Sequence, residues 1–94
     1  MTPVKWSRLS REDLNNAVDR QVDANFDIAV TLLEEASKAI IFLATSPRAG
    51  TPVSAQGRRK WRLGKLPYAL IYHVTKRVLI LRVAHLRSDW QTLL

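Results

Sequence analysis

The feature that most constrains the fold of this chain is a run of short, closely spaced apolar segments within residues 58–90. Tyr, Val, Ile and Leu dominate these segments, and such residues suit a pleated, half-buried surface. A tight turn is expected at Thr75 and Lys76, and a four-residue link containing glycine and proline separates the first two segments. The sequence therefore predicts three successive antiparallel strands, at residues 60–63, 68–74 and 77–85.

The preceding residues predict an edge strand and two helices. Residues 2–7 alternate apolar and polar side chains, as in a short strand. Ser10 is expected to cap a first helix that runs to about Ala24. Asn25 is expected to cap a second helix. This helix should end before Pro47, because the residue that precedes a proline is disfavoured in the α region.

The two helices have almost no loop between them, so they are expected to form an antiparallel hairpin. The second helix has a broad apolar face that should cover the sheet, made of Phe26, Ile28, Val30, Leu32, Leu33, Ala36, Ala39, Ile40 and Leu43. Residues 47–57 are expected to be a loop. The predicted fold is a single α+β domain over residues 1–94, of order β-α-α-β-β-β. In it, an N-terminal edge strand and the helical hairpin pack on a three- to four-stranded antiparallel sheet.

Alternation along the last strand predicts which side chains face the helices. Leu79, Leu81 and Val83 share one face, which we expect to lie against the helices. Arg82 lies on the opposite face, which we expect to point outward, among the apolar neighbours Val78, Ile80 and Ala84. An apolar surface of this kind is unusual when free, so something is expected to cover it.

Charge is distributed unevenly along the chain. Residues 58–94 carry nine Lys or Arg and one acid, a net charge of +8, whereas residues 1–57 carry −1. This basic half favours an acidic partner, either nucleic acid or an acidic protein. The chain has no cysteine, which leaves no disulfide framework or thiolate metal site. No apolar run approaches the ~20 residues of a membrane span, and no secretion signal is seen. A soluble, cytoplasmic protein is expected.

Four segments, in this order, make the sequence resemble a known family: LATSPRAG, GRRKWRL, PYALIYHV and RVLILRVAHLRSDW. Together they resemble the RelE/ParE superfamily of toxins from type II toxin–antitoxin systems, and they are closer to the ParE branch. The resemblance implies a toxin that inhibits DNA gyrase by protein–protein binding. It also implies a cognate ParD-like antitoxin with an acidic, amphipathic C-terminal tail. An assembly larger than a heterodimer stays open, and no cofactor or metal is implied.

The candidate contact residues for the antitoxin or the target lie in the basic half: Arg58, Arg59, Lys60, Arg62, Arg82, His85, Arg87 and Trp90. A simpler interpretation exists for several of them. Arg58, Arg59 and Lys60 would also suit a solvated turn, and Trp90 would also suit a cap on the core. The remaining aromatic residues of this half, Trp61, Tyr68 and Tyr72, alternate as packing residues of strands do.

Two other functions are considered. The RelE branch implies a ribosome-dependent mRNA endoribonuclease, which needs groups that move protons and stabilise phosphate charge. The candidates for that role are His85, Arg82, Arg87, Arg62 and Lys65. His85 would then be the acid or base, although a structural or contact role is the favoured interpretation for it. A plain nucleic-acid-binding module ranks last, because the strands lack a row of exposed aromatic residues.

Overall fold

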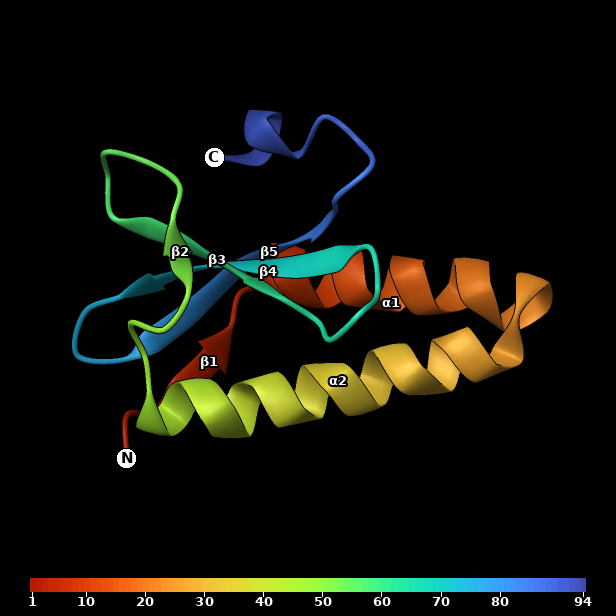
Figure 1. Cartoon of the computed structure of the whole chain (residues 1–94), viewed down its shortest axis with the longest axis horizontal. Coiled ribbons are helices and arrows are strands. Elements are labelled where there is room, and N and C mark those ends of the chain that lie inside the picture. Colours follow the sequence, from red (N-terminus) through yellow and green to blue (C-terminus); the bar gives the residue numbers. More distant parts are fainter.

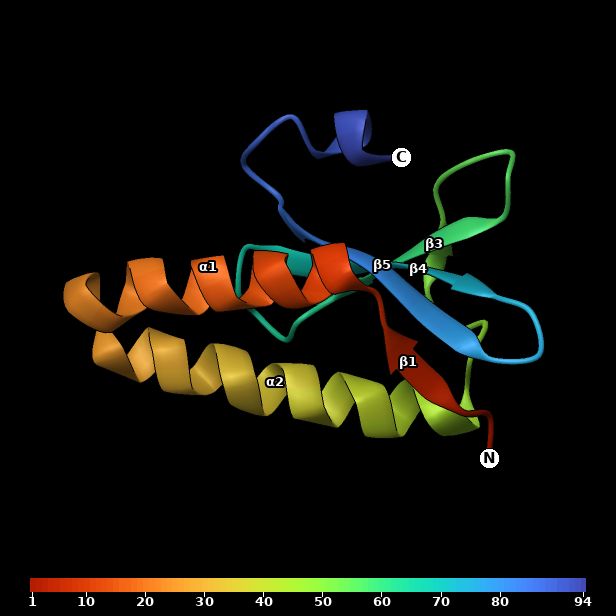
Figure 2. The same ribbon diagram turned by 180° about the vertical axis from the view of Figure 1, so that it is seen from behind.

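The computed structural model describes all 94 residues and has two layers, a helical hairpin and a five-stranded sheet (Figure 1). Its elements, in chain order, are β1 (Val4–Trp6), α1 (Arg8–Ala24), α2 (Phe26–Thr45), β2 (Thr51–Pro52), β3 (Arg58–Arg62), β4 (Tyr68–Val74), β5 (Val78–His85) and a 3-10 turn, η1 (Trp90–Leu93). Figure 2 shows the antiparallel helices from the other side. The predicted α+β class and order of the main elements are confirmed.

The sheet is mixed, with strand order β1-β5-β4-β3-β2. β1 pairs with β5 in parallel, with Val4 opposite Val78 and Trp6 opposite Ile80. The other pairs are antiparallel. The prediction of a purely antiparallel sheet of three to four strands was therefore wrong. Tight turns enforce antiparallel pairing only between successive strands, whereas the helical hairpin lies between β1 and the meander. β2, the fifth strand, lies in the segment expected to be a loop.

The helix caps confirm one prediction and correct another. Ser7, not Ser10, caps α1, and its Oγ accepts a hydrogen bond from the Ser10 N–H at 3.0 Å. Ser10 is fully buried in the first turn, so the helix begins earlier than predicted. Asn25 caps α2 as predicted, and its Oδ1 accepts from the Ile28 N–H at 3.3 Å. α2 ends at Thr45, shortly before Pro47.

The apolar face of α2 covers the sheet only in part. Its buried residues are Ala29, Leu32, Ala36, Ala39 and Leu43. Phe26, Val30 and Leu33 were expected to join them but are 65%, 38% and 47% exposed. The closed end of the hairpin projects beyond the sheet (Figure 1), so this end of α2 packs on α1 alone.

A β-bulge reverses the side-chain alternation of β5. Arg82 is opposite Ile71 and Ile80 is opposite Tyr72, so Leu81 is an extra residue without a partner. Before the bulge, Val78 and Ile80 point into the core, and only Val83 of the three predicted residues joins them. The prediction that Leu79 and Leu81 face the helices was therefore wrong.

Candidate binding surface

The strand register defines an outer face of the sheet, which points away from the helices. Leu70 and Tyr72 of β4 belong to the core beneath the helices, so their neighbours along β4 point outward. Cross-strand partners share a face. The outer face therefore contains Arg58, Lys60 and Arg62 of β3, Ala69, Ile71 and His73 of β4, and Leu79, Arg82 and Ala84 of β5.

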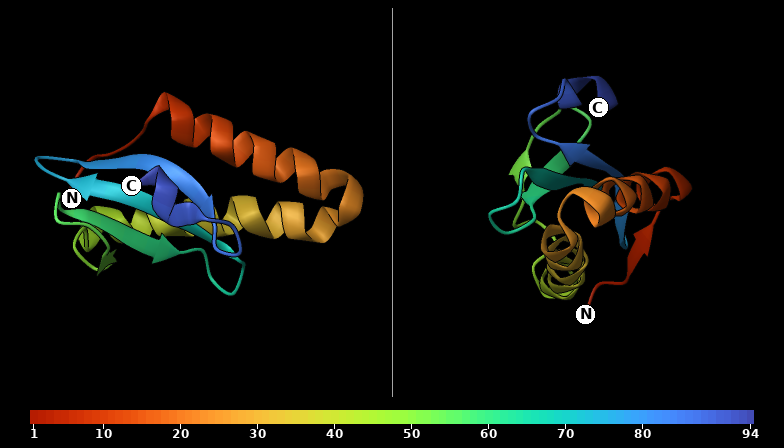
Figure 3. Two further views of the ribbon diagram at one scale, coloured as in Figure 1. Left: turned by 90° about the horizontal axis from the view of Figure 1, so that it is seen from above. Right: turned by 90° about the vertical axis from the view of Figure 1, so that its right-hand side faces the viewer.

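The floor of the outer face is apolar and is covered by the chain itself. Ala69, Ile71 and Ala84 are each 0% exposed although they point away from the helices. The C-terminal segment with η1 lies over this side of the sheet, opposite the helices (Figure 3). The Nζ atom of Lys60 lies 4.6 Å from the centroid of the Trp90 ring, a cation–π contact. The sequence predicted a covered apolar face around Arg82, but of the apolar neighbours expected there only Ala84 lies on this face, since Val78 and Ile80 belong to the core. The segment that covers the face belongs to the same chain.

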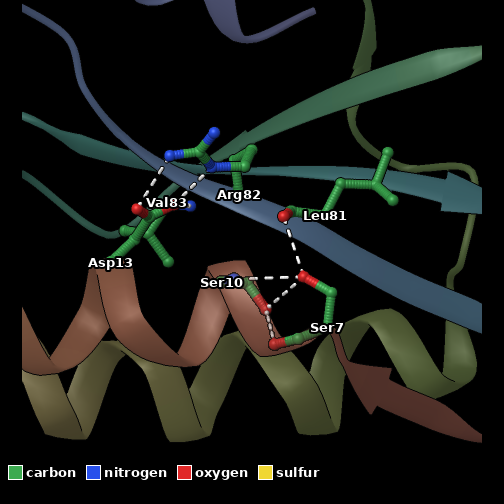
Figure 4. A network of polar contacts seen from close by, with 6 residues as sticks. All are labelled: Ser7, Ser10, Asp13, Leu81, Arg82 and Val83. Atoms are coloured by element: carbon green, nitrogen blue, oxygen red, sulfur yellow. Dashed lines mark hydrogen bonds and ion pairs between the residues drawn. The ribbon is translucent and has the colours of Figure 1, made fainter.

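Arg82 is held at the rim of this face by an ion pair. Its Nε and NH2 groups donate to the two carboxylate oxygens of Asp13, on α1, at 2.8 and 3.0 Å (Figure 4). This hydrogen bonding raises the pKa of the Arg82 guanidinium, and partial burial opposes the increase. Asp13 Oδ2 also accepts the Val83 N–H at 3.0 Å. Arg82 therefore joins α1 to the sheet as well as facing outward.

The same polar network closes the edge of β5 where β1 ends. The Ser7 N–H donates to the Ile80 carbonyl at 2.9 Å, and the Ser7 hydroxyl donates to the carbonyl of the bulge residue Leu81 at 2.9 Å (Figure 4). With the bond from Val83 to Asp13, α1 supplies the partners that a longer β1 would have supplied. No local sequence pattern links Asp13, on α1, to a strand that lies 70 positions away.

Two candidate arginines form hydrogen bonds with carbonyl groups. Arg62, on the outer face, donates to the carbonyls of Leu66 and Lys65 at 2.9 and 3.0 Å. Arg59 lies on the opposite face, opposite Tyr72. Its NH1 group donates to the carbonyl of Gly50 at 2.9 Å. Arg59 thus secures the loop before β2 rather than contributing to the outer face.

The side chains predicted for catalysis do not converge on a common site. His85 shares the inner face with Tyr68, whose ring it meets edge-on with centroids 4.9 Å apart. Its Nδ1 atom accepts the Arg87 N–H at 3.1 Å. Arg62 and Arg82 lie on the outer face and are already bonded to other groups. The histidine that lies on the outer face is His73, opposite Arg58, and it was not among the predicted site residues.

Most cations of the basic half lack an acidic partner. The structure has three ion pairs, Arg8–Glu12, Lys38–Glu35 and Arg82–Asp13. Of the nine cations after residue 57, only Arg82 is therefore paired. Such uncompensated charge attracts acidic ligands and speeds their encounter. The outer face of the sheet is thus an electropositive surface with an apolar floor.

A second apolar surface lies on the helical side and was not predicted. A groove of about 620 Å³ runs between α1, α2 and β1. Its apolar lining residues are Trp6, Leu14, Leu33, Ala36, Ile40 and Ile41. Ile41 is 71% exposed, which is high for a large apolar side chain on a monomer.

No His, Cys, Asp or Glu residues gather in a group of three or more that could hold a metal ion. Neither helix is both long and apolar enough to cross a membrane.

The fold and this surface define the class of the protein: a small α+β protein with a basic sheet face whose apolar floor lies under the C-terminal segment. The family comparison is more specific. Residues 4–90 match the family described as ParE toxin of type II toxin-antitoxin system, parDE, so the chain belongs to the ParE toxin family.

A solved structure described as the chromosomal ParDE TA system from P. aeruginosa has the same fold. It superposes with a TM-score of 0.79 at 24% sequence identity, over 93% of this chain and 98% of that chain. A comparison with curated proteins gives no match.

Proposed function

We propose that this ParE-family toxin inhibits DNA gyrase by protein–protein binding and is neutralised by a cognate antitoxin, both acting in the cytoplasm. One observation carries the proposal against catalysis: the candidate catalytic groups lie on two faces of the sheet. His85 faces inward, against Tyr68, whereas Arg62 and Arg82 face outward. A general acid and the groups that stabilise a phosphate must reach the same reacting atoms.

The outer face of the sheet is suited to binding. Arg58 and Lys60 lie on the outer face without an acidic partner, beside an apolar floor. An acidic, amphipathic antitoxin tail has the complementary chemistry, since such a segment orders as it binds. Of the other candidate contacts, Arg87 is exposed and Trp90 lies against Lys60.

The target is tested by purified supercoiling and translation assays run side by side. We expect the toxin to stop gyrase from supercoiling relaxed plasmid in the presence of ATP, and to leave in vitro translation intact. Cleavage of mRNA on the ribosome, with gyrase unaffected, would instead establish the RelE-like activity. In that case His85 with Arg62, Lys65, Arg82 and Arg87 would be the first residues to substitute.

The role of Arg82 in antitoxin binding needs a matched pair of variants. We expect Arg82→Ala to weaken binding of the antitoxin, measured by calorimetry, because it removes a cation from the rim of the covered face. Asp13→Asn disrupts the same ion pair but keeps the arginine. If both variants lose affinity equally, Arg82 acts only by positioning α1, and an unchanged affinity for Arg82→Ala removes it from the interface.

A further inference from the structure

Three segments that are far apart in the sequence meet at the end of the molecule opposite the closed end of the helical hairpin (Figure 1). They are the N-terminus, the loop that follows α2 and the turn between β4 and β5. Together they line a hollow of about 550 Å³. None of the residues predicted for binding or catalysis lines it. Its polar and charged lining residues are Thr2, Ser46, Arg48, Thr75 and Lys76.

This lining is rich in hydrogen-bond donors that have no partner in the chain. The hydroxyl groups of Thr2, Ser46 and Thr75 form no hydrogen bond within the protein. The backbone N–H groups of Arg48 and Lys76 have no acceptor. The side chains of both cations are exposed and form no ion pair. No acid lines the hollow, so its positive charge is uncompensated.

Backbone hydrogen bonds hold each of the three segments in place. The Thr2 N–H donates to the carbonyl of Ala44, at the end of α2, at 2.8 Å. NH1 of Arg59 donates to the Arg48 carbonyl at 3.0 Å and thereby ties the loop to β3. The Thr75 N–H donates to a carbonyl of its own turn at 3.0 Å. A hollow whose walls are fixed in this way loses little conformational entropy when a ligand binds.

The donor set suits a phosphate group. Phosphate oxygens accept hydrogen bonds from hydroxyls, from backbone N–H groups and from Lys and Arg side chains, and these are the groups present here. No aromatic ring lines the hollow, so a nucleotide base would have nothing to stack on. The two cations are exposed at its rim, where the backbone of a polymer can pass over them. The chemistry therefore favours a backbone phosphate over a free nucleotide.

We propose that this hollow binds a backbone phosphate of duplex DNA, without regard to base sequence. The choice of duplex DNA rests on the gyrase part of the proposed function, because an inhibitor of an enzyme that supercoils DNA acts beside a duplex. The outer face of the sheet is not needed for this contact. The hollow adds a second, sequence-independent contact to the protein–protein binding already proposed.

A fluorescently labelled short duplex and the full chain test the site, with affinity measured by anisotropy at several salt concentrations. We expect Arg48→Gln and Lys76→Gln each to weaken binding about three- to tenfold at low salt, and to reduce the slope of log affinity against log salt by about 1. Two duplexes of unrelated sequence should respond equally. Arg20→Gln removes the same charge from an exposed position near the closed end of the hairpin and should change both quantities little.

Amide chemical shifts locate the duplex on the chain. We expect the amides of residues 48–50 and 75–77 to move when the duplex is added, and those of residues 58–62 and 69–71 to stay in place. Shifts confined to the outer face would overturn the inference, and so would equal effects of Lys76→Gln and Arg20→Gln. Shifts at the hollow with inorganic phosphate, but none with the duplex, would also overturn it.

These measurements contain no gyrase, so they separate this inference from the proposed target. If gyrase is inhibited but the duplex does not bind at the hollow, the inference alone fails. Binding of the duplex at the hollow without inhibition of gyrase would support the inference and remove the proposed target.

Discussion

The two faces of the sheet are equally well buried at their centres but are covered in different ways. The inner face lies under two helices that are tied to it by side-chain packing and by polar bonds such as Asp13 to Arg82 and Val83. The outer face lies under a short segment whose residues 89–94 have no hydrogen bond to the rest of the chain. Burial alone therefore does not distinguish the two faces, whereas the attachment of the cover does.

The largest effects on stability are expected for substitutions of two adjacent residues of β4, which test the difference between the two faces. Leu70 and Ile71 are both 0% exposed, but they point to opposite faces. We expect Leu70→Ala to lower the free energy of unfolding by about 3–4 kcal/mol, because packed helices leave a cavity. Ile71→Ala should cost about 2 kcal/mol, since a loosely attached cover can settle into the space. Urea denaturation measures both, and equal losses would show that the two covers are equally rigid.

Gly50 tests the attachment of the inner face to the loop before β2. A Cβ atom at this position would lie 2.5 Å from the Tyr72 Oη and 2.8 Å from the Lys60 carbonyl oxygen. It would also disturb the hydrogen bond from the Gly50 N–H to the Tyr72 hydroxyl, at 2.8 Å. We expect Gly50→Ala to cost about 2–3 kcal/mol of unfolding free energy.

Gly57→Ala is the matched control for that substitution. Gly57 has a φ of 82° but nothing within 4 Å of the added carbon, so only backbone strain of about 1 kcal/mol is expected. A larger loss at Gly57 than at Gly50 in the same denaturation experiment would contradict the packing argument.

The ion pair between Asp13 of α1 and Arg82 of β5 should contribute less to the free energy of unfolding than a core side chain, but more than an exposed ion pair. The side chains of Arg82 and Asp13 are 28% and 18% exposed. Asp13→Asn should therefore cost about 1–2 kcal/mol, including the weakened bond to the Val83 N–H. The exposed pair Arg8–Glu12 provides the comparison, since Glu12→Gln should cost less than about 0.5 kcal/mol. Thermal unfolding at low and high salt distinguishes the two.

The smallest effect on stability is expected for the substitution of Lys60, at the outer face. Lys60→Ala removes a cation–π contact worth about 0.5–1 kcal/mol, and it also removes repulsion among the unpaired cations of β3. We expect the two changes to offset each other in the melting temperature, while affinity for acidic peptides falls. A clear loss of stability would mean that Lys60 anchors the C-terminal segment more firmly than its contacts indicate.

Local patterns predicted most of the fold. The runs of β-branched and aromatic residues located β4 exactly where periodicity placed it, and Asn25 marked the break between the helices. The bulge at Leu81 was not predictable, because alternation alone cannot reveal an extra residue. As a result, alternation placed Val78, Leu79, Ile80 and Leu81 on the wrong faces of β5. The parallel pairing of β1 depends on contacts between distant residues, and no local pattern encodes it.

The sequence predicted which residues could form the candidate site, but not how they are arranged. Charge counting identified the basic half, but the register alone shows that Arg58, Lys60, Arg62 and Arg82 share a face while Arg59 and His85 do not. Asp13 was missed because it meets Arg82 across 69 positions of sequence. The apolar residues predicted around Arg82 indicated that something covers this face. Only the structure shows that the cover is a segment of the same chain and not a partner.

The pairing of β1 with β5 also determines when the sheet can be completed during synthesis of the chain. Val4 to Trp6 find their partners only when residues 78–80 have left the ribosome. At about 5–20 residues per second, roughly 4–15 s pass between the synthesis of the two strands. The helical hairpin forms early from local contacts, but the basic sheet closes last. A growing chain therefore has an incomplete sheet until β5 has been made.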